Sequence, residues 1–480
     1  MQPTPVLVLD NGASTIKIGI VAPGGHEEPL PADARIVTNA IVRQTKGEKK
    51  TFFGHEFDRC RDFSSLHFRL PFERGYLTDW DAQKAIWDGL FYAKDGVKVN
   101  TSETSLIITE PYFNLPNIQD QYDQFVFEEY DFQSCYRCAP ASLLPYGALF
   151  GSEGYHGAPE CMLIVDSGYS FTHVVPLMSG KVLWKSVRRR VWSALWTGLD
   201  VGGKLLTNYL KELLSFRQYD LMGETYITND VKERCCYVST NYKEDMELSR
   251  FESSKIVQEY ILPRYSENRP GRVKTQEDVL TGEDDVLRMN TERFAVGELL
   301  FRPSDIGLLQ AGLSHMIADA ISSLPEDVQG LFWANIGIIG GNARLPGFRN
   351  RLMTELRSLA PAEHEVRIYE SSNPIIAAYL AGAEFARQPG LANVCVTRAE
   401  YQESGSRACR RKFKYATWQA REDEEETAQE PRKDMGTNAG MSSSRTRSRG
   451  SKAQEGAHDS ATGTERKPSR SSRSRTVTKS

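Results

Sequence analysis

The sequence predicts an α/β protein built from two related halves and followed by a disordered tail. Apolar runs of strand length alternate with stretches of helical spacing through most of the 480 residues. One ten-residue motif occurs twice, with its aspartates at positions 10 and 166, about one domain length apart. The composition then changes after about residue 418. These observations together predict a duplicated body with a separate C-terminal segment.

Five apolar runs predict strands. Residues 5–9 end in Asp-Asn-Gly and residues 15–21 resume the apolar run, which is the turn chemistry of a hairpin. Further buried strands are expected over 105–109, before a Glu-Pro pair, over 161–165, before Asp-x-Gly, and over 336–339, before Gly-Gly. Helical spacing predicts helices over 120–130 and 204–214, the second with four leucines and a tyrosine on one face.

The internal repeat aligns residues 8–17 with residues 164–173. Each copy is an apolar strand followed by Asp-x-Gly, with a serine four positions after the aspartate and a basic or imidazole side chain seven after it. Two such turns facing each other across a cleft would clamp a polyphosphate, because glycine lets a phosphate approach the main chain. The alternative is that each Asp-x-Gly is only a structural turn, which is common.

The residue types around these turns suit a metal-bound polyphosphate. Asp10 and Asp166 would lie at the cleft mouth, where hydrated Mg²⁺ prefers one or two carboxylates together with phosphate oxygens. Lys17 would reach the phosphates as a point charge. Gly340, Gly341 and Asn342 follow a strand and would let a third backbone segment lie against a nucleoside.

The composition excludes some classes of protein. An apolar fraction of 40% and a charged fraction of 25% are ordinary for a globular chain. No apolar run reaches the roughly 20 residues that cross a bilayer, and Asp10 interrupts any signal-peptide core, so secretion is not expected. The eight cysteines have no regular spacing beyond one C-x-x-C at Cys135 and Cys138, which favours a reduced, intracellular compartment over a metal site.

The net charge of −4 hides a division of the chain. Residues 431–480 carry 12 Lys and Arg against 4 Asp and Glu, a net +8, so residues 1–430 carry −12. The last fifty residues contain no aromatic side chain, and they cannot bury enough apolar surface to offset chain entropy. The basic tail could attract DNA phosphates or act as a nuclear import signal, and a solvated linker is an equal alternative.

Over about residues 5–413 the chain resembles the actin superfamily. Blocks in the order found in actin carry the resemblance: Tyr76-Leu77-Thr78-Asp79-Trp80, Asp166-Ser167-Gly168, Asp200-Val201-Gly202-Gly203, Glu292-Arg293-Phe294 and Gly340-Gly341-Asn342. The resemblance implies an actin-like fold, in which duplicated ribonuclease-H-like domains surround a nucleotide cleft. The implied organisation is a first half at 1–165 with a reduced subunit-contact loop at 43–54, a second half at 166–395, a return to the first half at 396–418, and a disordered tail at 419–480.

The same resemblance assigns residues to a nucleotide, expected to be ATP with Mg²⁺ held structurally. The implied site residues are Asp10, Asn11, Gly12, Ser14, Lys17, Asp166, Ser167, Gly168, Gly203, Lys232, Glu233, Gly340, Gly341, Asn342, Arg344 and Arg398. Asp10 and Asp166 would hold the metal through water.

Several positions depart from the actin pattern. Tyr169 and Ser170 replace the Asp and Gly of the second phosphate loop, and Arg344 replaces a methionine that packs on adenine. Pro140 falls where actin has the glutamine that orients the attacking water, and proline has no side-chain hydrogen-bonding group. The shortened polar loop at 43–54 argues against a filament, which needs a repeating subunit contact. Residues 187–198 are an insertion without an assigned role.

Several segments resemble most closely a nuclear subfamily of actin-related proteins. The resemblance implies a non-enzymatic subunit of the Swr-type chromatin remodelling complex, which exchanges histone two-A for its Z variant. The expected partners are a zinc-finger subunit, the Snf2-type motor, histones or the nucleosome, and DNA through the tail. The expected location is the nucleus, and also the cytoplasm. The alternatives are an active ATPase or small-molecule kinase on this fold, and a cytoskeletal actin-like polymer.

Overall fold

The computed structural model describes residues 4–22, 35–46, 49–151, 157–187, 200–251, 254–267, 269–280 and 282–419. These residues all belong to one structural unit, Met1–Ala428. The predicted tail beyond Gln419 and the insertion beyond Val187 lie outside the described residues.

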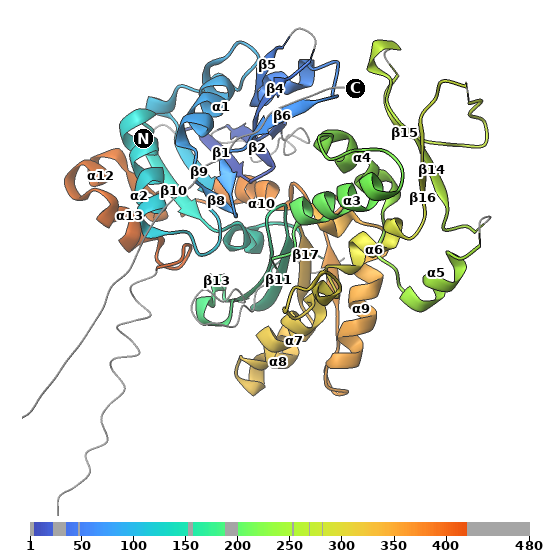
Figure 1. Ribbon diagram of the computed structural model, residues 1–480. Coiled ribbons are helices and arrows are strands. Elements are labelled where there is room, and N and C mark those ends of the chain that lie inside the picture. Colours follow the sequence, from blue (N-terminus) through green and yellow to red (C-terminus); the bar gives the residue numbers. More distant parts are fainter. Residues whose placement is uncertain are drawn as a thin grey trace, which may run out of the picture. The chain divides into compact units, whose positions relative to one another are not determined.

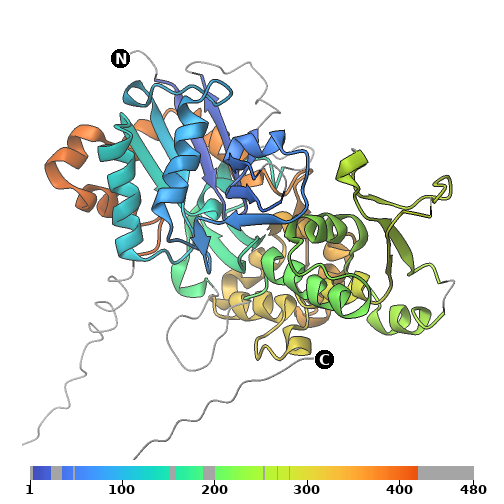
Figure 2. The same ribbon diagram turned by 45° about the horizontal axis from the view of Figure 1, so that its top comes forward.

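The first sheet has six strands in the order β19-β10-β9-β1-β2-β3 (Figure 1). Its strands are β1 (Val6–Asn11), β2 (Thr15–Val21), β3 (Arg35–Thr38), β9 (Ser105–Thr109), β10 (Ser134–Cys138) and β19 (Val396–Thr397). β1 and β2 form an antiparallel hairpin, whereas β9 runs parallel to β1 and β10 parallel to β9. One face packs against α1 (Trp80–Tyr92), α2 (Pro116–Gln124) and α13 (Ser406–Phe413). In both views α12 (Arg398–Ser404) and α13 lie beside α2 (Figures 1 and 2).

The second sheet has five strands in the order β13-β12-β11-β17-β18. They are β11 (Cys161–Ser167), β12 (Thr172–Met178), β13 (Lys181–Val182), β17 (Ile336–Ile339) and β18 (Ile368–Glu370). Its helices are α3 (Gly203–Arg217), α6 (Glu292–Glu298), α7 (Leu313–Ser322), α8 (Glu326–Trp333) and α9 (Phe348–Leu359), which share one apolar core with the sheet.

A central apolar cluster joins the two sheets. It combines one face of β1 with one face of β11 and β12, and it includes α10 (Ala377–Ala386) and the 3₁₀ helix η4 (Pro140–Tyr146). Burial of this cluster holds the ends of β1 and β11 in place, since apolar burial contributes roughly 25 cal/mol per Å². The two repeat hairpins therefore start from a shared core.

Three smaller sheets complete the unit. β4 (Ile41–Gln44), β5 (Thr51–Phe53) and β6 (Leu66–Arg69) form one, β7 (Phe72–Glu73) and β8 (Tyr76–Leu77) a second, and β14 (Gln258–Ile261), β15 (Arg272–Val273) and β16 (Val286–Met289) a third. The last lies beside α4 (Thr225–Cys235), with α5 (Tyr242–Leu248) nearby (Figure 1). β4 and β5 pair from Ile41 opposite Phe53 to Arg43 opposite Thr51, so only six residues separate the two strands in the predicted subunit-contact loop.

The mixed α/β architecture expected from the sequence is confirmed, and each predicted strand and helix has a counterpart. The helix expected over 120–130 differs most: α2 ends at Gln124, and the chain continues as a π-helical turn over Phe125–Glu129. Cys135 and Cys138 pack on opposite faces of the first sheet, and all eight cysteines are free. Among the described residues, no helix is both long and apolar enough to traverse a bilayer.

Candidate functional site

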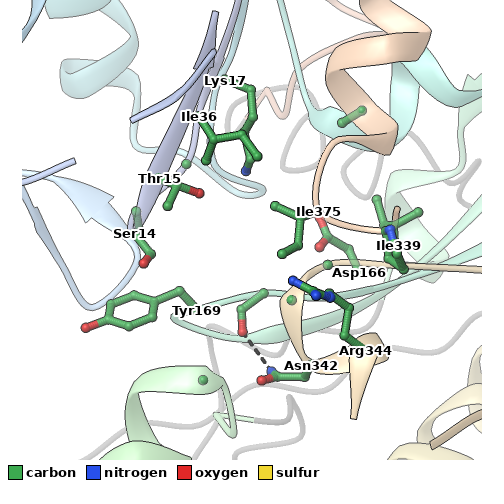
Figure 3. Close-up of a pocket in the computed structure, with 18 of the residues that line it drawn as sticks. Ser14, Thr15, Lys17, Ile36, Asp166, Tyr169, Ile339, Asn342, Arg344 and Ile375 are labelled. Atoms are coloured by element: carbon green, nitrogen blue, oxygen red, sulfur yellow. Dashed lines mark hydrogen bonds between the residues drawn. The ribbon is translucent and has the colours of Figure 1, made fainter. Parts of the chain in front are cut away.

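A cleft of about 550 Å³ opens between the two repeat hairpins. Its walls come from both turns, the start of α3, the end of α4, and the segments after β17 and β18. The lining residues are Asp10, Gly12, Ala13, Ser14, Thr15, Lys17, Ile36, Pro140, Asp166, Gly168, Tyr169, Gly203, Asn229, Lys232, Glu233, Ile339, Gly340, Gly341, Asn342, Arg344, Leu345, Pro374, Ile375 and Ala378. Figure 3 shows Ser14, Thr15, Lys17 and Ile36 on one side, opposite Asp166, Asn342 and Arg344.

The two hairpins share one register. Asp10 pairs with Lys17 across β1 and β2, and Asp166 pairs with His173 across β11 and β12. In each case one further pair, Asn11 with Ile16 or Ser167 with Thr172, separates it from a four-residue turn that starts with glycine. The sequence repeat is therefore a repeat of backbone geometry.

In the first hairpin the carboxylate has close partners on both oxygens. Lys17 Nζ lies 3.1 Å from Asp10 Oδ2, and the Thr109 hydroxyl donates to Asp10 Oδ1 at 2.8 Å. Both charged side chains are about nine-tenths buried. The turn is also held from behind, because Asn39 donates its side-chain amide to the Gly12 carbonyl and its backbone N–H to the Ser14 carbonyl.

In the second hairpin the carboxylate has a neutral partner. The Tyr112 hydroxyl donates to Asp166 Oδ2 at 3.0 Å. Burial raises the pKa of Asp166 to about 6; the Tyr112 hydrogen bond lowers it, the charge of Asp10 adds to the rise, and Lys17 opposes it. Asp166 is thus the carboxyl group in this cleft whose charge is least compensated by the protein.

Two further segments hold the second turn. The first amides of α3 bind it, since Gly203 N–H donates to the Gly168 carbonyl and Lys204 N–H to the Tyr169 carbonyl. The Asn342 side chain donates to the Gly168 carbonyl at 2.9 Å. Gly340 has φ +93°, and a Cβ there would lie 2.3 Å from the Ser167 carbonyl, so this close approach requires glycine.

Helix α4 contributes a buried lysine. The Lys232 ammonium donates to Thr207 Oγ1 and Asn229 Oδ1, both at 2.9 Å, and to the Gly203 carbonyl at 3.3 Å. These acceptors are all neutral, and burial lowers the lysine pKa. Glu233, next in sequence, accepts from the Asn229 amide at 2.7 Å. A buried cation with only neutral partners favours an anionic ligand nearby.

The positions that depart from the actin pattern are accommodated. Arg344 is exposed on the cleft wall and points toward its centre in Figure 3, whereas the ring of Tyr169 is turned away from Asp166 in that view. Neither Tyr169 nor Ser170 adopts a positive φ, so this turn does not need glycine at those positions. Pro140 lines the cleft as the first residue of η4.

The structure brings most of the predicted site residues together on the cleft. Those on its wall are Asp10, Gly12, Ser14, Lys17, Asp166, Gly168, Gly203, Lys232, Glu233, Gly340, Gly341, Asn342 and Arg344. Asn11 and Ser167 lie one position away and face inward, where Asn11 donates to the Tyr122 hydroxyl and Ser167 bonds with Thr172.

The structure does not bring Arg398 to the cleft. Arg398 begins α12 beside the edge strand β19, where its guanidinium forms an ion pair with Asp131. After β18 the chain contributes Pro374, Ile375 and Ala378 to the cleft and then leaves it along α10. By residue 398 it has returned to the edge of the first sheet, and Arg398 lies apart from the other predicted site residues.

Other residues of the site were not predicted. Asn229 precedes Lys232 by three positions on α4, so helical spacing from the predicted lysine would have found it. Ile339 and Leu345 flank the predicted Gly-Gly segment. Pro374, Ile375 and Ala378 carry no charge and no motif, and nothing in the sequence separates them from ordinary core residues.

An aromatic contact joins the β4–β6 sheet region to α4. The rings of Phe63 and Tyr226 stack with centroids 4.2 Å apart, and Phe57 meets Tyr226 edge-on at 5.8 Å. The Ser65 backbone N–H donates to both carboxylate oxygens of Glu224, at 3.0 and 2.9 Å. Since α4 also carries Lys232, this contact couples that small sheet to one wall of the cleft.

Comparison with known proteins agrees with this geometry. The family model described as Actin matches residues 1–414. The chain belongs to the actin family. It is 46% identical to the actin-like protein ARP6 of Cryptococcus neoformans, over 86% of this chain and 85% of that protein. It is 35% identical to actin-related protein 6 of Drosophila melanogaster, over 83% and 97%, and 34% identical to actin-related protein 6 of Arabidopsis thaliana, over 85% and 99%.

Membership of the actin family indicates nucleotide binding, and the cleft has suitable chemistry. Small turn residues, Lys232 and Arg344 could bind phosphates, and Gly341, where an added Cβ would meet no other atom within 4 Å, leaves room for a nucleoside. Among the described residues no cluster of three or more His, Cys, Asp or Glu could form a metal cage. A metal at Asp10 and Asp166 would therefore depend on water and phosphate oxygens for most of its ligands.

Proposed function

We propose that this protein is a non-filamentous, non-enzymatic subunit of a Swr-type nuclear chromatin remodelling complex that exchanges histone two-A for its Z variant. It would act in the nucleus, and also occur in the cytoplasm, contributing structure and contacts to histones or the nucleosome in transcription regulation. A separate Snf2-type motor would supply ATP hydrolysis, and a zinc-finger subunit would be a direct partner.

The proposal is supported by the names of the similar proteins taken together with one residue on the cleft wall. Relatives called actin-related protein 6 match most of the chain, and the cleft of this chain holds Pro140 on its wall. Proline cannot orient a water molecule through its side chain or through an N–H. ATP with Mg²⁺ would then be a structural ligand, which stabilises the fold by mass action.

Affinity purification from nuclear extract tests the assembly. Tagged full-length protein should co-elute with remodelling subunits, including the motor and a zinc-finger protein, and the complex should contain about one bound adenine nucleotide per copy. A monomer recovered without remodelling subunits would overturn the proposal. The basic tail can be tested in the same preparation, because its removal should lower DNA binding if it contacts phosphates.

The two alternatives predict different results from the isolated protein. Sustained release of phosphate from ATP would favour an active ATPase or kinase. Concentration-dependent pelleting with ATP would favour a cytoskeletal polymer. The short β4–β5 turn supports the monomer, since it leaves little chain for a subunit contact.

A further inference from the structure

The Tyr112 hydroxyl lies between the two halves of the molecule, next to the cleft. Tyr112 follows β9 in the first half and is 4% exposed. Its hydroxyl donates to Asp166 Oδ2 at 3.0 Å and accepts from the Ala141 N–H at 3.2 Å. Ala141 directly follows Pro140, which lines the cleft. One oxygen atom therefore connects the second hairpin to η4.

The ring is fixed as firmly as the hydroxyl. Its centroid lies 4.6 Å from that of His173, and His173 meets Phe171 edge-on at 5.9 Å. Burial, followed by the charge of Asp166, raises the pKa of Tyr112 well above its ordinary value. The ring contact and the two hydrogen bonds together fix the hydroxyl in this position.

Hydrolysis of a bound polyphosphate would need a water held by an acceptor beside the turns. The carboxylates on the cleft wall are Asp10, Asp166 and Glu233. Asp10 already accepts from Lys17 and Thr109. Glu233 lies on α4 and already accepts from the Asn229 side-chain amide. Among these carboxylates Asp166 is the remaining candidate, and its Oδ2 already accepts the hydrogen of the Tyr112 hydroxyl.

The backbone N–H that could donate a hydrogen bond to such a water is also occupied. Pro140 has no N–H, so the first backbone N–H of η4 belongs to Ala141, and it points to the Tyr112 oxygen. A water in this place would accept from Ala141 and donate to Asp166. The phenol oxygen makes both of these hydrogen bonds.

We propose that Tyr112 is a blocking residue, whose hydroxyl occupies the position that a nucleophilic water would need between Asp166 and η4. This inference rests on the proposed binding of ATP without hydrolysis. It implies that two independent features prevent hydrolysis, the missing side-chain polar group at Pro140 and the filled water position at Tyr112. Restoring activity should require both to be changed.

Single-turnover hydrolysis of preloaded ATP with Mg²⁺ by the full chain tests this inference. The variants are Pro140→Gln, Tyr112→Leu and the double variant, with Tyr112→Phe plus Pro140→Gln as a milder second version. Each single variant should hydrolyse ATP within about twofold of wild type. The double variant should be faster by at least about tenfold, which is less than the roughly 10²- to 10⁴-fold that a well-positioned acid–base group supplies.

Tyr260→Leu combined with Pro140→Gln is the matched control. Tyr260 is equally buried, 1% exposed, and its hydroxyl bonds Asp230 on α4; neither Tyr260 nor Asp230 is among the residues that line the cleft. This control should show no gain in rate, which separates an emptied water position from general loosening. A gain equal to that of the Tyr112 double variant would overturn the inference.

Retained ATP and melting temperature, measured in parallel, separate this inference from the proposed function. If the double variant folds, binds ATP as wild type does and hydrolyses it no faster, the blocking role of Tyr112 is overturned. The proposed function is not affected by that result. A Pro140→Gln variant as fast as the double variant also overturns the blocking role. Wild-type protein that binds no ATP, or turns it over unaided, overturns both proposals.

Discussion

The two repeat hairpins have the same backbone register and opposite electrostatics. In the first, Asp10 faces Lys17 across the hairpin and forms an ion pair with it. In the second, His173 takes the position of Lys17, and Asp166 relies on the neutral hydroxyl of Tyr112. One buried carboxylate is thus compensated within its own hairpin, whereas the other carries a pKa raised to about 6.

The support of the two turns is similar even though the charges differ. Asn39 donates its side-chain amide to the Gly12 carbonyl, and Asn342 does the same for the Gly168 carbonyl, each at 2.9 Å. The duplicated fold therefore keeps the main-chain geometry of both turns. The side chains around each carboxylate have diverged, and this allows one turn to hold its charge stably while the other remains sensitive to a ligand.

The substitution expected to change the free energy of unfolding most is Asp10→Asn in the first hairpin. The substitution keeps an acceptor for Thr109 and leaves Lys17, about nine-tenths buried, without its counter-ion. Breaking a buried ion pair from one side costs several kcal/mol, so we expect a loss of about 3 kcal/mol in the free energy of unfolding. Urea unfolding of the full chain in nucleotide-free buffer with a chelator measures it.

The double variant Asp10→Asn with Lys17→Met is the control for that measurement. Removing the unpaired Lys17 ammonium should recover a large part of the lost free energy of unfolding, since neutral replacement of both partners is far less costly than removal of one. Equal losses in the single and double variants would show that the ion pair is not what distinguishes the first hairpin.

At the equivalent position of the second hairpin, Asp166→Asn should change the free energy of unfolding in the opposite direction. A carboxyl whose folded pKa is raised from 3.8 to about 6 makes the folded state bind more protons than the unfolded state between those values. Its contribution to stability is therefore lost as pH rises from about 4 to 6. At pH 7 the neutral amide should stabilise the nucleotide-free chain by about 1–2 kcal/mol, less than the full shift implies, because the cleft admits water.

The pH dependence provides the check on this second prediction. The difference in stability between wild type and Asp166→Asn should be near zero at pH 4 and grow as the pH rises to 7. A constant difference over that range, or destabilisation at pH 7, would contradict the assignment of an uncompensated charge to the second hairpin.

The sequence predicted the parts of this site that local chemistry determines. Asp-x-Gly between apolar runs specifies a turn at a strand end, and hence the positions of Asp10 and Asp166. Arg398 lies outside the cleft lining, and no local signal in the sequence shows that the chain has already left the cleft at this point. Tyr112 and Asn39 could not be assigned, since their partners lie 54 and 27 residues away and only tertiary packing brings them together.

The smallest expected difference lies in the first glycine of each turn. A Cβ at Gly12 would lie 2.7 Å from the Thr15 carbonyl, which must move, whereas at Gly168 the nearest atom, the Phe171 carbonyl oxygen, is 3.5 Å away. Neither glycine has a positive φ, so steric contact alone separates them.

Alanine restricts the unfolded chain and stabilises by roughly 0.4–1 kcal/mol where it fits. Gly168→Ala should therefore be neutral or slightly stabilising in urea unfolding, and Gly12→Ala should destabilise by about 1 kcal/mol. Equal effects would mean that the two turns tolerate side chains alike, and that their difference is confined to charge.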